Sequence, residues 1–470
     1  MSAFPPPAAP APHESLLPAE ILAAQMRRDR DRLAASEMMI AVLQEQQRRL
    51  ERTPPQRALR QLQSAYRRLP VSLRAAVRRL RGGVPGAAQA PGAAAVAVVP
   101  PASRGQALVI DDHWPQPDRD AGSVEIVNLV RALMALGFDV VLAAARDHAG
   151  AHPARLALER DGIRCLCPAD AASVEDYLAQ RGSCLDLCVL CRVYCGGRFL
   201  EAALRDARRS RILFNTIDLN YLREERRARL QQDEAALAIA AQVRIREEQL
   251  IRASDATLVV SRAELELLAQ TVPEALVAEL PLARPLSPPA TPFAGRSGIG
   301  FIGGFAHAPN VDAVRYFLDE IWPLVLRRLP ELELTIVGPD FPVGLLHGVP
   351  GRVRALGQLP EIGPWLEGLR LTVAPLRFGS GAKGKVASSL AAGVPCIVTP
   401  VAAEGMLLDG GAGVLVGDTP EAFAARLCEA YADEALWRGL SASGLAHAAA
   451  HLSPEAWRAR LDRLLLQIGL

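Results

Sequence analysis

Lysine is nearly absent from this chain of 470 residues, because only Lys383 and Lys385 among its 53 basic residues are lysine and the others are arginine. Charge of one sign is not in excess either, since 51 acidic residues leave a formal net charge of +2, which argues against a general nucleic-acid-binding protein. No apolar run reaches the roughly 18 residues that a membrane-spanning helix needs. The N-terminus lacks a basic start followed by an apolar core, so no secretory signal is expected. These absences predict a soluble cytoplasmic protein, whose length fits about three domains.

Cysteine is present but is not arranged like a zinc site or a disulfide framework. Six of the eight cysteines lie between residues 165 and 195. Four of them, in "CLDLCVLCRVYC", could be taken for zinc ligands, namely Cys184, Cys188, Cys191 and Cys195. The segment is apolar and lacks the turn residues that wrap a metal, so it predicts a buried strand in which cysteine acts as a small hydrophobe. Structural disulfides are not expected in a cytoplasmic chain.

The first hundred residues differ in composition from the rest of the chain. After a Pro/Ala-rich start, apolar residues recur at helical spacing, and residues 52–81 contain nine arginines and no acidic residue. One interpretation is a solvated helical tail or a short coiled coil. The other is a basic amphipathic helix within residues 20–82 that contacts an anionic membrane surface or an acidic partner. Residues 1–100 are expected to form an Arg-rich helical extension with a Pro/Ala-rich linker.

From Gln106 the sequence alternates between strand and helix patterns, which is typical of a doubly wound parallel sheet. Proline and glycine interrupt this alternation at residues 283–298, and a second alternating series follows. The sequence therefore predicts an α/β protein with two Rossmann-like domains, at residues 104–285 and 296–470. Ligands of such sheets bind at the carboxyl ends of the strands, so a cleft between the two domains is the expected site.

The expected strands are short apolar runs bounded by turn residues. In the first domain they cover residues 106–111, 138–144, 162–167, 185–191, 211–216 and 256–261. In the second domain they cover residues 299–304, 332–338, 353–357, 369–376, 395–400 and 413–417. Helices are expected between them, including one at residues 121–137 that ends at Gly137 and an unusually long one at residues 222–255.

The loop "FGSGAKGKV" matches two well-known phosphate-binding patterns at once. Gly379, Gly381 and Gly384 spell GxGxxG, the dinucleotide fingerprint, and Gly379, Gly384 and Lys385 spell GxxxxGK, the triphosphate loop. The first pattern normally lies in the first strand–helix turn of its domain, whereas this loop comes late in the second one. The second pattern needs a hydroxyl after its lysine, where this chain has Val386. A strand precedes the loop and a helix follows it, so an anion site of another kind is expected.

The two lysines single out this loop. Both lysines of an otherwise arginine-only chain fall within three residues of each other, next to the glycines. Lysine is a compact point charge and arginine a planar fork, and the two are not interchangeable beside a phosphate. Chance survival of two lysines is the alternative, but a functional role is favoured. Lys383 and Lys385 are predicted to neutralise a diphosphate.

Two other loops carry candidate residues. Gly303 and Gly304 follow the first strand of the second domain, where a glycine pair lets the backbone approach a ligand or simply makes a tight turn. In the first domain a polar loop ends at Gly122, just inside the start of a helix. Asp118 and Asp120 in that loop form a DxD pattern that could hold a metal, although capping of the helix explains Asp120 and no metal is expected.

Several segments resemble glycosyltransferase family 4, a family with the two-domain GT-B fold. The donor-binding half of that family is similar to "IGFIGGFAHAPNVDAVRYF", "VAPLRFGSGAKGKV" and "SLAAGVPCIVTPVAAEGM", and its first half to "VIDDHWPQPDRDAGS" and "FNTIDLNYLREER". The resemblance covers residues 106–470, with a GxGxKxK donor loop that marks a bacterial subgroup. It implies a nucleotide-diphosphate sugar as co-substrate, no cofactor, no metal, and transfer with retention of anomeric configuration.

The resemblance also implies roles for individual residues. Gly303 and Gly304 would meet the donor diphosphate, Lys383 and Lys385 would offset its charge, and Gly122 would approach it from the first half. The loop Glu404–Gly405–Met406 would lie near the sugar or phosphate, and Asp218 would face the acceptor. Asp218 and His113 are the candidates for an assisting base, although either could simply line the cleft.

One departure from the family concerns two glutamates in an E-x7-E pattern, one on the sugar and one on the ribose. Their places fall on Ser380 and Ser388 here, which can hydrogen-bond but carry no charge. The sequence as a whole predicts a cytoplasmic hexosyl- or deoxyhexosyl-type glycosyltransferase, peripheral at the inner face of the membrane if its extension binds lipid. A glycan, a lipid-linked sugar or another molecule would be the acceptor, in cell-surface polysaccharide synthesis. The alternatives are an inactive binding or scaffold protein of the same fold and a nucleotide-sugar epimerase.

Overall fold

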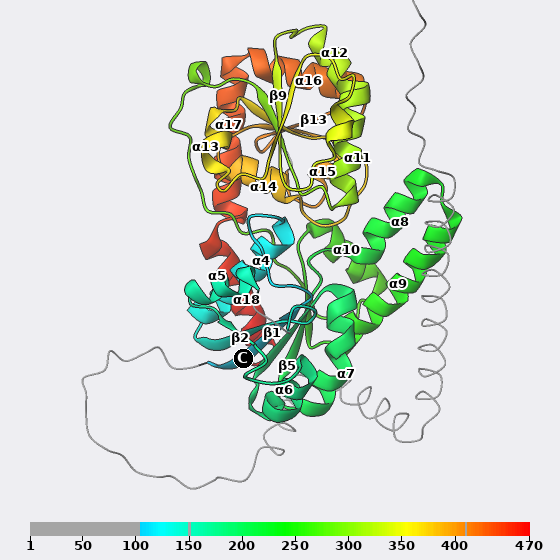
Figure 1. The fold of residues 1–470 in the computed structure, drawn as a ribbon, viewed down its shortest axis with the longest axis vertical. Helices are drawn as coiled ribbons and strands as arrows, with labels where there is room; N and C mark the ends of the chain where they lie inside the picture. Colours follow the sequence, from blue (N-terminus) through cyan, green and yellow to red (C-terminus); the bar gives the residue numbers. More distant parts are fainter. Residues whose placement is uncertain (1–103, 149–151, 409–410) are drawn as a thin grey trace, which may run out of the picture. The chain divides into compact units, whose positions relative to one another are not determined.

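The computed structural model describes residues 104–148, 152–408 and 411–470, which form two parallel β-sheets with helices around them (Figure 1). The predicted helical extension at residues 1–100, including the proposed membrane or partner contact at residues 20–82, lies outside these residues. Among the helices that are described, none combines the length and apolarity required to cross a bilayer.

The first sheet has seven strands, all parallel, in the order β3-β2-β1-β4-β5-β6-β7. Its strands are β1 (Gly105–Asp111), β2 (Phe138–Ala144), β3 (Arg164–Cys165), β4 (Leu187–Cys191), β5 (Arg211–Asn215), β6 (Ala256–Val259) and β7 (Val277–Glu279). Its helices are α4 (Ala121–Ala135), α5 (Pro153–Arg160), α6 (Val174–Arg181), α7 (Gly197–Asp206), α8 (Asn220–Gln231), α9 (Glu234–Ala253) and α10 (Arg262–Thr271). The six strands expected from the sequence are confirmed, and β7 is one that the sequence did not reveal.

The second sheet has six parallel strands in the order β10-β9-β8-β11-β12-β13. Its strands are β8 (Ile299–Ile302), β9 (Glu333–Val337), β10 (Arg352–Gly357), β11 (Leu371–Ala374), β12 (Cys396–Val398) and β13 (Val414–Val416). The helices that follow in the chain are α11 (Ala308–Tyr316), α12 (Trp322–Leu326), α13 (Gly363–Gly368), α14 (Gly384–Ala391), α15 (Pro400–Ala403), α16 (Pro420–Ala432), α17 (Glu434–His451) and α18 (Pro454–Gln467). All six strands expected in this half are confirmed.

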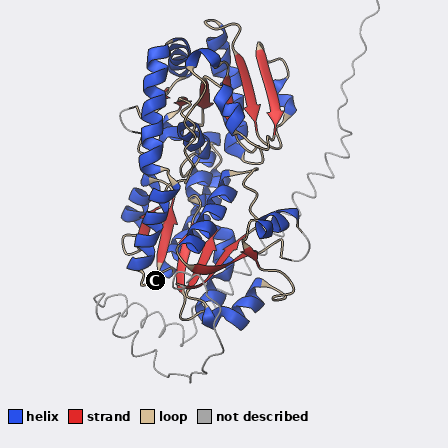
Figure 2. Cartoon of the chain, turned by 90° about the vertical axis from the view of Figure 1, so that its left-hand side faces the viewer, coloured by secondary structure: helices blue, strands red, loops and turns tan. Residues whose placement is uncertain are grey.

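Helices cover both faces of the sheets (Figure 2), and the first sheet shows why its strands are so apolar. Successive residues of β4 enter different cores, with Cys188 and Leu190 on one face and Val189 and Cys191 on the other. A strand buried on both faces has to be apolar throughout. Of the four cysteines expected in a buried strand and its ends, Cys188, Cys191 and Cys195 are buried, whereas Cys184 is exposed, and all eight cysteines are free thiols.

The prediction of one continuous helix over residues 222–255 is wrong, because the structure has two helices there, α8 and α9. The chain turns back at Gln232, whose φ of 55° is left-handed, and Asp233 then caps α9 by accepting a hydrogen bond from the Ala236 amide at 2.9 Å. The outcome is a helical hairpin of α8 and α9. The residues "QQD" at 231–233 separate the two helices. The helical periodicity continues on both sides of them, so the sequence pattern did not reveal the break.

The last helix, α18, packs in the core of the first sheet rather than of the second. Its buried residues join the cluster that also holds α4 and the face of β1 that carries Ala107 and Val109, and these are Trp457, Leu461, Leu464, Leu465 and Ile468. The Arg284 amide donates to the Leu452 carbonyl at 2.7 Å, so the two segments that cross between the halves are bonded to each other. The domain ranges 104–285 and 296–470 remain a prediction, and α18 is a segment that packs outside its own range.

Candidate active site

The glycine loop lies between β11 and α14, as the sequence predicts. Lys383 occupies the N-cap position of α14, and no side chain caps this end of the helix. The first amides of a helix that lacks a cap carry partial positive charge and are free to bind an anion. The loop therefore has the geometry of an anion site even without its lysines.

Lys383 is buried in this loop. Its Nζ donates to the Ser380 carbonyl at 3.2 Å and to the Gly381 carbonyl, and its amide donates to Met406 Sδ at 3.4 Å. Burial lowers the pKa of Lys383 to about 8, although the carboxylates of Glu264 and Glu404 act in the opposite direction. An anion bound beside it would raise this pKa back toward its ordinary value.

Lys385 reaches the Gly303–Gly304 turn through one asparagine. Its Nζ donates to Asn310 Oδ1 at 2.8 Å, and Asn310 Nδ2 donates to the Gly304 carbonyl at 2.7 Å. A Cβ at Gly303 would lie 2.7 Å from Asn310 Nδ2, so this position has no room for a side chain. Burial lowers the pKa of Lys385 to about 8, with Lys383 acting in the same direction. The structure thus brings the two predicted donor loops together.

Asp218 of the first half touches the glycine loop of the second. Ser380 Oγ donates to Asp218 Oδ2 at 2.9 Å, and Arg223 donates to the same carboxylate. Burial opposes ionisation of this carboxyl group, but Arg223 and Ser380 outweigh it and lower the pKa of Asp218. The position at which the family resemblance places a glutamate, Ser380, is therefore in contact with a carboxylate after all.

Glu404 and its neighbours also contact the first half. Arg226 of α8 donates to Glu404 Oε1 at 2.8 Å and to the Gly379 carbonyl at 2.8 Å. Gly405 has a φ of 70°, and a Cβ there would lie 2.7 Å from Ser261 Cβ. Its carbonyl accepts from the Arg262 amide at 3.0 Å. The Glu404–Gly405–Met406 loop thus lies at the boundary of the two halves, beside Lys383.

Gly122 lies at the N-terminal end of α4, which meets the N-terminal end of α14. A Cβ on Gly384 would lie 2.7 Å from Ala121 Cβ, and one on Gly122 would lie 3.0 Å from Arg192 Nη2. Asp120 caps α4 by accepting from the Ser123 amide at 2.8 Å. Two helix N-termini therefore converge from opposite halves, and the one without a carboxylate cap, that of α14, keeps its full partial positive charge.

Ser388 and His113 are placed differently from the other candidates. Ser388 Oγ accepts from Arg284 Nε at 3.2 Å, and Arg284 also pairs with the buried Glu125 at 2.5 Å. His113 is exposed, and its Nδ1 lies 3.1 Å from Asp147 on the first half. The hydrogen bonds of His113 hold it to the β1 and β2 loops rather than to the lysine cluster.

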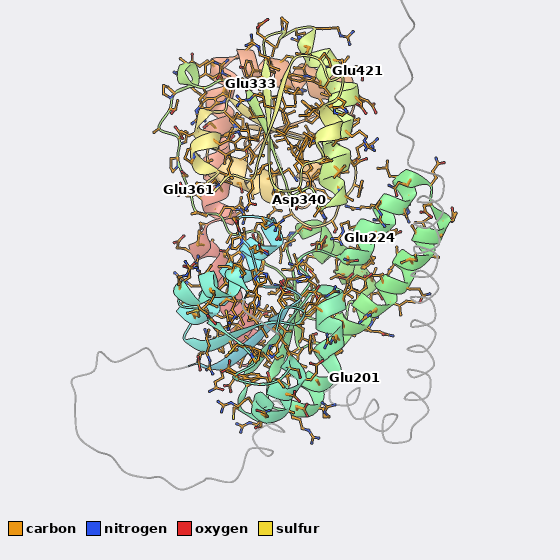
Figure 3. The ribbon with its side chains drawn as sticks, viewed as in Figure 1. Glu201, Glu224, Glu333, Asp340, Glu361 and Glu421 are labelled. Atoms are coloured by element: carbon orange, nitrogen blue, oxygen red, sulfur yellow. The ribbon has the colours of Figure 1, made fainter. Side chains whose placement is uncertain are left out.

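The DxD pattern resolves into two separate contacts. Asp118 Oδ2 accepts from Gln358 Nε2 at 2.5 Å, and Asp120 caps α4. Arg119 between them donates to Asp340 at 3.0 Å, a residue labelled in Figure 3 on the second half. Across the described ranges no group of three or more His, Cys, Asp or Glu side chains is arranged to hold a metal ion.

Sequence reasoning missed several residues of the site. His307 follows the Gly303–Gly304 turn, and desolvation, with Arg223 and Lys385, lowers its pKa to about 4, so it is neutral at pH 7. Sequence reasoning did not single out Arg223, Arg226 and Arg284, because the chain has 51 arginines and no spacing marks these three. Only their contacts in the folded structure, where loops of the two halves come together, identify these side chains as part of the site.

Two buried glutamates support the segment that carries Asp218. Glu247 of α9 accepts from the amides of Asn220 at 3.2 Å and Tyr221 at 3.1 Å. Glu264 of α10 accepts from the Leu219 amide at 2.9 Å, while its other oxygen has no hydrogen-bond partner. Burial raises the pKa of Glu247 to about 8 and that of Glu264 to about 7. An acid within the apolar stripe of α9 was the signal that could have identified Glu247.

The two parallel-sheet halves, with their facing loops at the carboxyl ends of the strands, have the GT-B fold. Residues 296–433 match the family model described as "Glycosyl transferases group 1". The match covers most of the second half, while the first half lies outside it. No curated protein matches the chain.

Solved structures support the same fold at low sequence identity. A sucrose-phosphate synthase from Thermosynechococcus elongatus is 17% identical, with a TM-score of 0.61 over 78% of this chain and 99% of that one. The Anabaena protein HepE, in complex with UDP-glucose, is 12% identical, with a TM-score of 0.56 over 77% and 100% of the two chains. A glycosyltransferase from Rickettsia africae is 9% identical, with a TM-score of 0.56 over 77% and 98%. These likenesses establish the fold of residues outside the family match.

Proposed function

We propose that this chain is a glycosyltransferase that moves a sugar from a nucleotide-diphosphate sugar to an acceptor. The observation that carries the proposal is the pair of lysines at the uncapped start of α14, Lys383 buried and Lys385 partly buried, within reach of the Gly303–Gly304 turn. Two cations with lowered pKa values and free helix amides suit a group with two negative charges close together, as in a diphosphate. The match to a group 1 glycosyltransferase model at residues 296–433 supports the same class.

The proposed roles of the residues follow from where negative charge develops on the donor during sugar transfer. As the glycosidic bond to the diphosphate breaks, negative charge grows on the bridging oxygen, and Lys383, Lys385 and the α14 amides stabilise it. The leaving phosphate can take the proton of the acceptor hydroxyl on the same face, so transfer with retention needs no pair of catalytic carboxylates. Asp218 is the carboxylate placed to receive or orient an acceptor hydroxyl, because it joins the first half to the donor loop through Ser380. This route needs no metal.

The donor class to test first is a uridine-diphosphate sugar. Two similar structures point there, since HepE is described with UDP-glucose and a Staphylococcus aureus TarM variant with UDP and α-GlcNAc-glycerol. The experiment is incubation of the full chain with UDP-, GDP- and TDP-sugars while release of the nucleoside diphosphate is followed. We expect release with at least one donor and a loss of at least about 100-fold in the variant with Lys383→Ala and Lys385→Ala.

Two alternatives give different outcomes in the same assay. An inactive binding or scaffold protein would bind a nucleotide sugar in calorimetry without releasing nucleoside diphosphate on any acceptor. An epimerase would convert one nucleotide sugar into another with the diphosphate bond intact. If calorimetry detects no nucleotide-sugar binding by the wild type, both the transferase and the epimerase proposals fail.

We further propose a place in polysaccharide assembly on the cytoplasmic side of a membrane, with a glycan or lipid-linked acceptor. The Arg-rich residues 20–82 would supply the attachment to anionic lipid or to a partner chain. Co-sedimentation of the full chain with anionic and with neutral vesicles tests this, and a chain without residues 20–82 serves as the control. Equal binding to both vesicles, or to neither, contradicts an electrostatic attachment.

A further inference from the structure

Tyr194 is the one aromatic side chain of the described residues that is exposed, with 50% of its surface accessible to solvent. It lies just beyond the carboxyl end of β4, in the π-helical turn Arg192–Gly196 that leads into α7. Val193 and Cys195 on either side are buried in the core between the first sheet and its helices. The buried side chains of Val193 and Cys195 therefore anchor the turn to the core, while the phenol ring of Tyr194 faces solvent.

The backbone here is irregular in two independent ways. Arg192 has a φ of 61°, which is unfavourable for a residue with a side chain, and five residues adopt the rare π-helical form. Gly196 is packed so tightly that a Cβ would lie 3.0 Å from Leu190 Cβ. Such irregularities persist only where packing over-determines them, and they concentrate at functional sites. The ring of Tyr194 is the side chain that this turn displays.

The surroundings of the ring connect it to the candidate active site. The Arg246 guanidinium lies 5.8 Å from the ring centroid. Burial of part of the phenol raises the pKa of Tyr194, with Glu224, Arg246 and Arg223 among the charged groups that act on it. Arg223 in turn donates to Asp218, which meets Ser380 of the glycine loop. One of the charged groups that act on the ring, Arg223, thus also binds the carboxylate at the point where the two halves meet.

We propose that Tyr194 is the stacking platform of an acceptor subsite, and that its ligand is the pyranose ring of a saccharide. This inference rests on the proposed function, whose acceptor it narrows to a sugar. One face of a pyranose is made of C–H groups, which suit the electron-rich face of an aromatic ring. The hydroxyl groups around the pyranose edge suit charged donors and acceptors such as those of Arg246 and Glu224.

A lipid chain does not fit this position. An acyl chain needs a contiguous apolar surface, whereas the groups that act on the ring are the charged side chains of Arg246, Glu224 and Arg223. The ring is isolated among charges, as a saccharide-binding aromatic should be. Leu204 of α7, ten residues further along the chain, is an apolar residue of similar exposure, with 44% of its surface accessible. It serves as a matched control for Tyr194.

The test measures saccharide binding directly, without a donor. Saturation-transfer NMR on the full chain would use the methyl glycosides of glucose, galactose, mannose, N-acetylglucosamine and rhamnose as probes. We expect at least one to bind through its C–H face, Tyr194→Phe to bind within about threefold of wild type, and Tyr194→Ala to bind about tenfold more weakly. Leu204→Ala should match wild type. Unchanged binding by Tyr194→Ala, or no bound probe in the wild type, overturns the proposal.

A second measurement separates this inference from the proposed function. Nucleoside-diphosphate affinity is measured by calorimetry on the same samples, because that group is assigned to the second half of the chain. An equal loss of saccharide and nucleoside-diphosphate affinity in Tyr194→Ala overturns a role specific to the acceptor. A wild type that binds saccharides but no nucleotide sugar refutes the transferase and leaves the saccharide subsite standing.

Discussion

Arg226 and Glu404 form a bidentate ion pair between the two halves of the molecule, 178 residues apart, with Nη1–Oε2 at 2.5 Å and Nη2–Oε1 at 2.8 Å. The same guanidinium donates to the Gly379 carbonyl at 2.8 Å. One side chain of the first half therefore holds both the glycine loop and the Glu404 loop of the second. Separation of the two halves would therefore break the contacts of both loops with Arg226 at once.

A double-mutant cycle on Arg226→Gln and Glu404→Gln should give a coupling free energy of about 1 kcal/mol, since a bidentate pair is strong but this one is partly exposed. The measurement is the free energy of urea unfolding of the four proteins. Arg227→Gln on the same helix, whose partner is Glu224 three residues away, is the control for a generic loss of arginine. Strict additivity of the two single changes would contradict a direct interaction between the halves.

Nucleoside-diphosphate affinity should fall as the pH rises from 7 to 9. Burial lowers the pKa of Lys383 and of Lys385 to about 8, so both are charged below that pH and neutral above it, and an anion binds the charged form. Binding near pH 8 should take up protons, which calorimetry detects in buffers of different ionisation enthalpy. Lys385→Arg keeps its charge at all these pH values and should flatten the dependence. A pH-independent affinity in the wild type would exclude the lysines as the anion contacts.

Glu264→Gln should raise the thermal midpoint above pH 7 and change it little at pH 4. Burial raises the pKa of Glu264 to about 7 from an ordinary 4.5. The folded chain then holds more protons than the unfolded chain between these values, so the stabilisation present at low pH is lost as the pH rises through 7. Glutamine can still accept from the Leu219 amide and has no charge to bury. Scanning calorimetry at pH 4, 6 and 8 measures the effect, and a pH-independent difference between the two proteins would contradict it.

Trp457→Ala should destabilise the first half by about 3–5 kcal/mol. Trp457 of α18 is 4% accessible and packs in the core of the first sheet, although it lies near the end of the chain. Leu466→Ala on the same helix is the control, because Leu466 is 60% accessible and its loss should change stability by less than about 0.5 kcal/mol. Similar unfolding midpoints for the two variants would mean that α18 does not belong to that core.

The sequence predicted the strands and the glycine loop for reasons that are local. Apolar runs such as that of β4 admit no other interpretation when they alternate with helices, and the scarcity of lysine marked Lys383 and Lys385 without reference to any structure. Gly303 was also predictable, because a glycine after a first strand is a local signal. These features depend on neighbours along the chain.

The contacts between the halves could not be predicted in the same way. Arg226 is one of many arginines, and only its approach to Glu404 distinguishes it. Glu247 and Glu264 were overlooked because charged residues on helices usually face solvent, whereas these two cap the start of α8 from within the core. The break at Gln232 was missed since a left-handed residue other than glycine leaves a weak sequence signal.

The hydrogen bond from the Arg284 amide to the Leu452 carbonyl has a mechanical consequence. The chain passes between the halves twice, and the two passages are joined at this point, so it is the natural pivot for any rotation of one half against the other. In such a rotation, atoms close to the pivot move little. The ion pairs Arg119–Asp340 and Arg226–Glu404, which join the two halves elsewhere, would break and re-form. Because α18 returns to the first half, two chain segments rather than one join the halves, and they are bonded to each other.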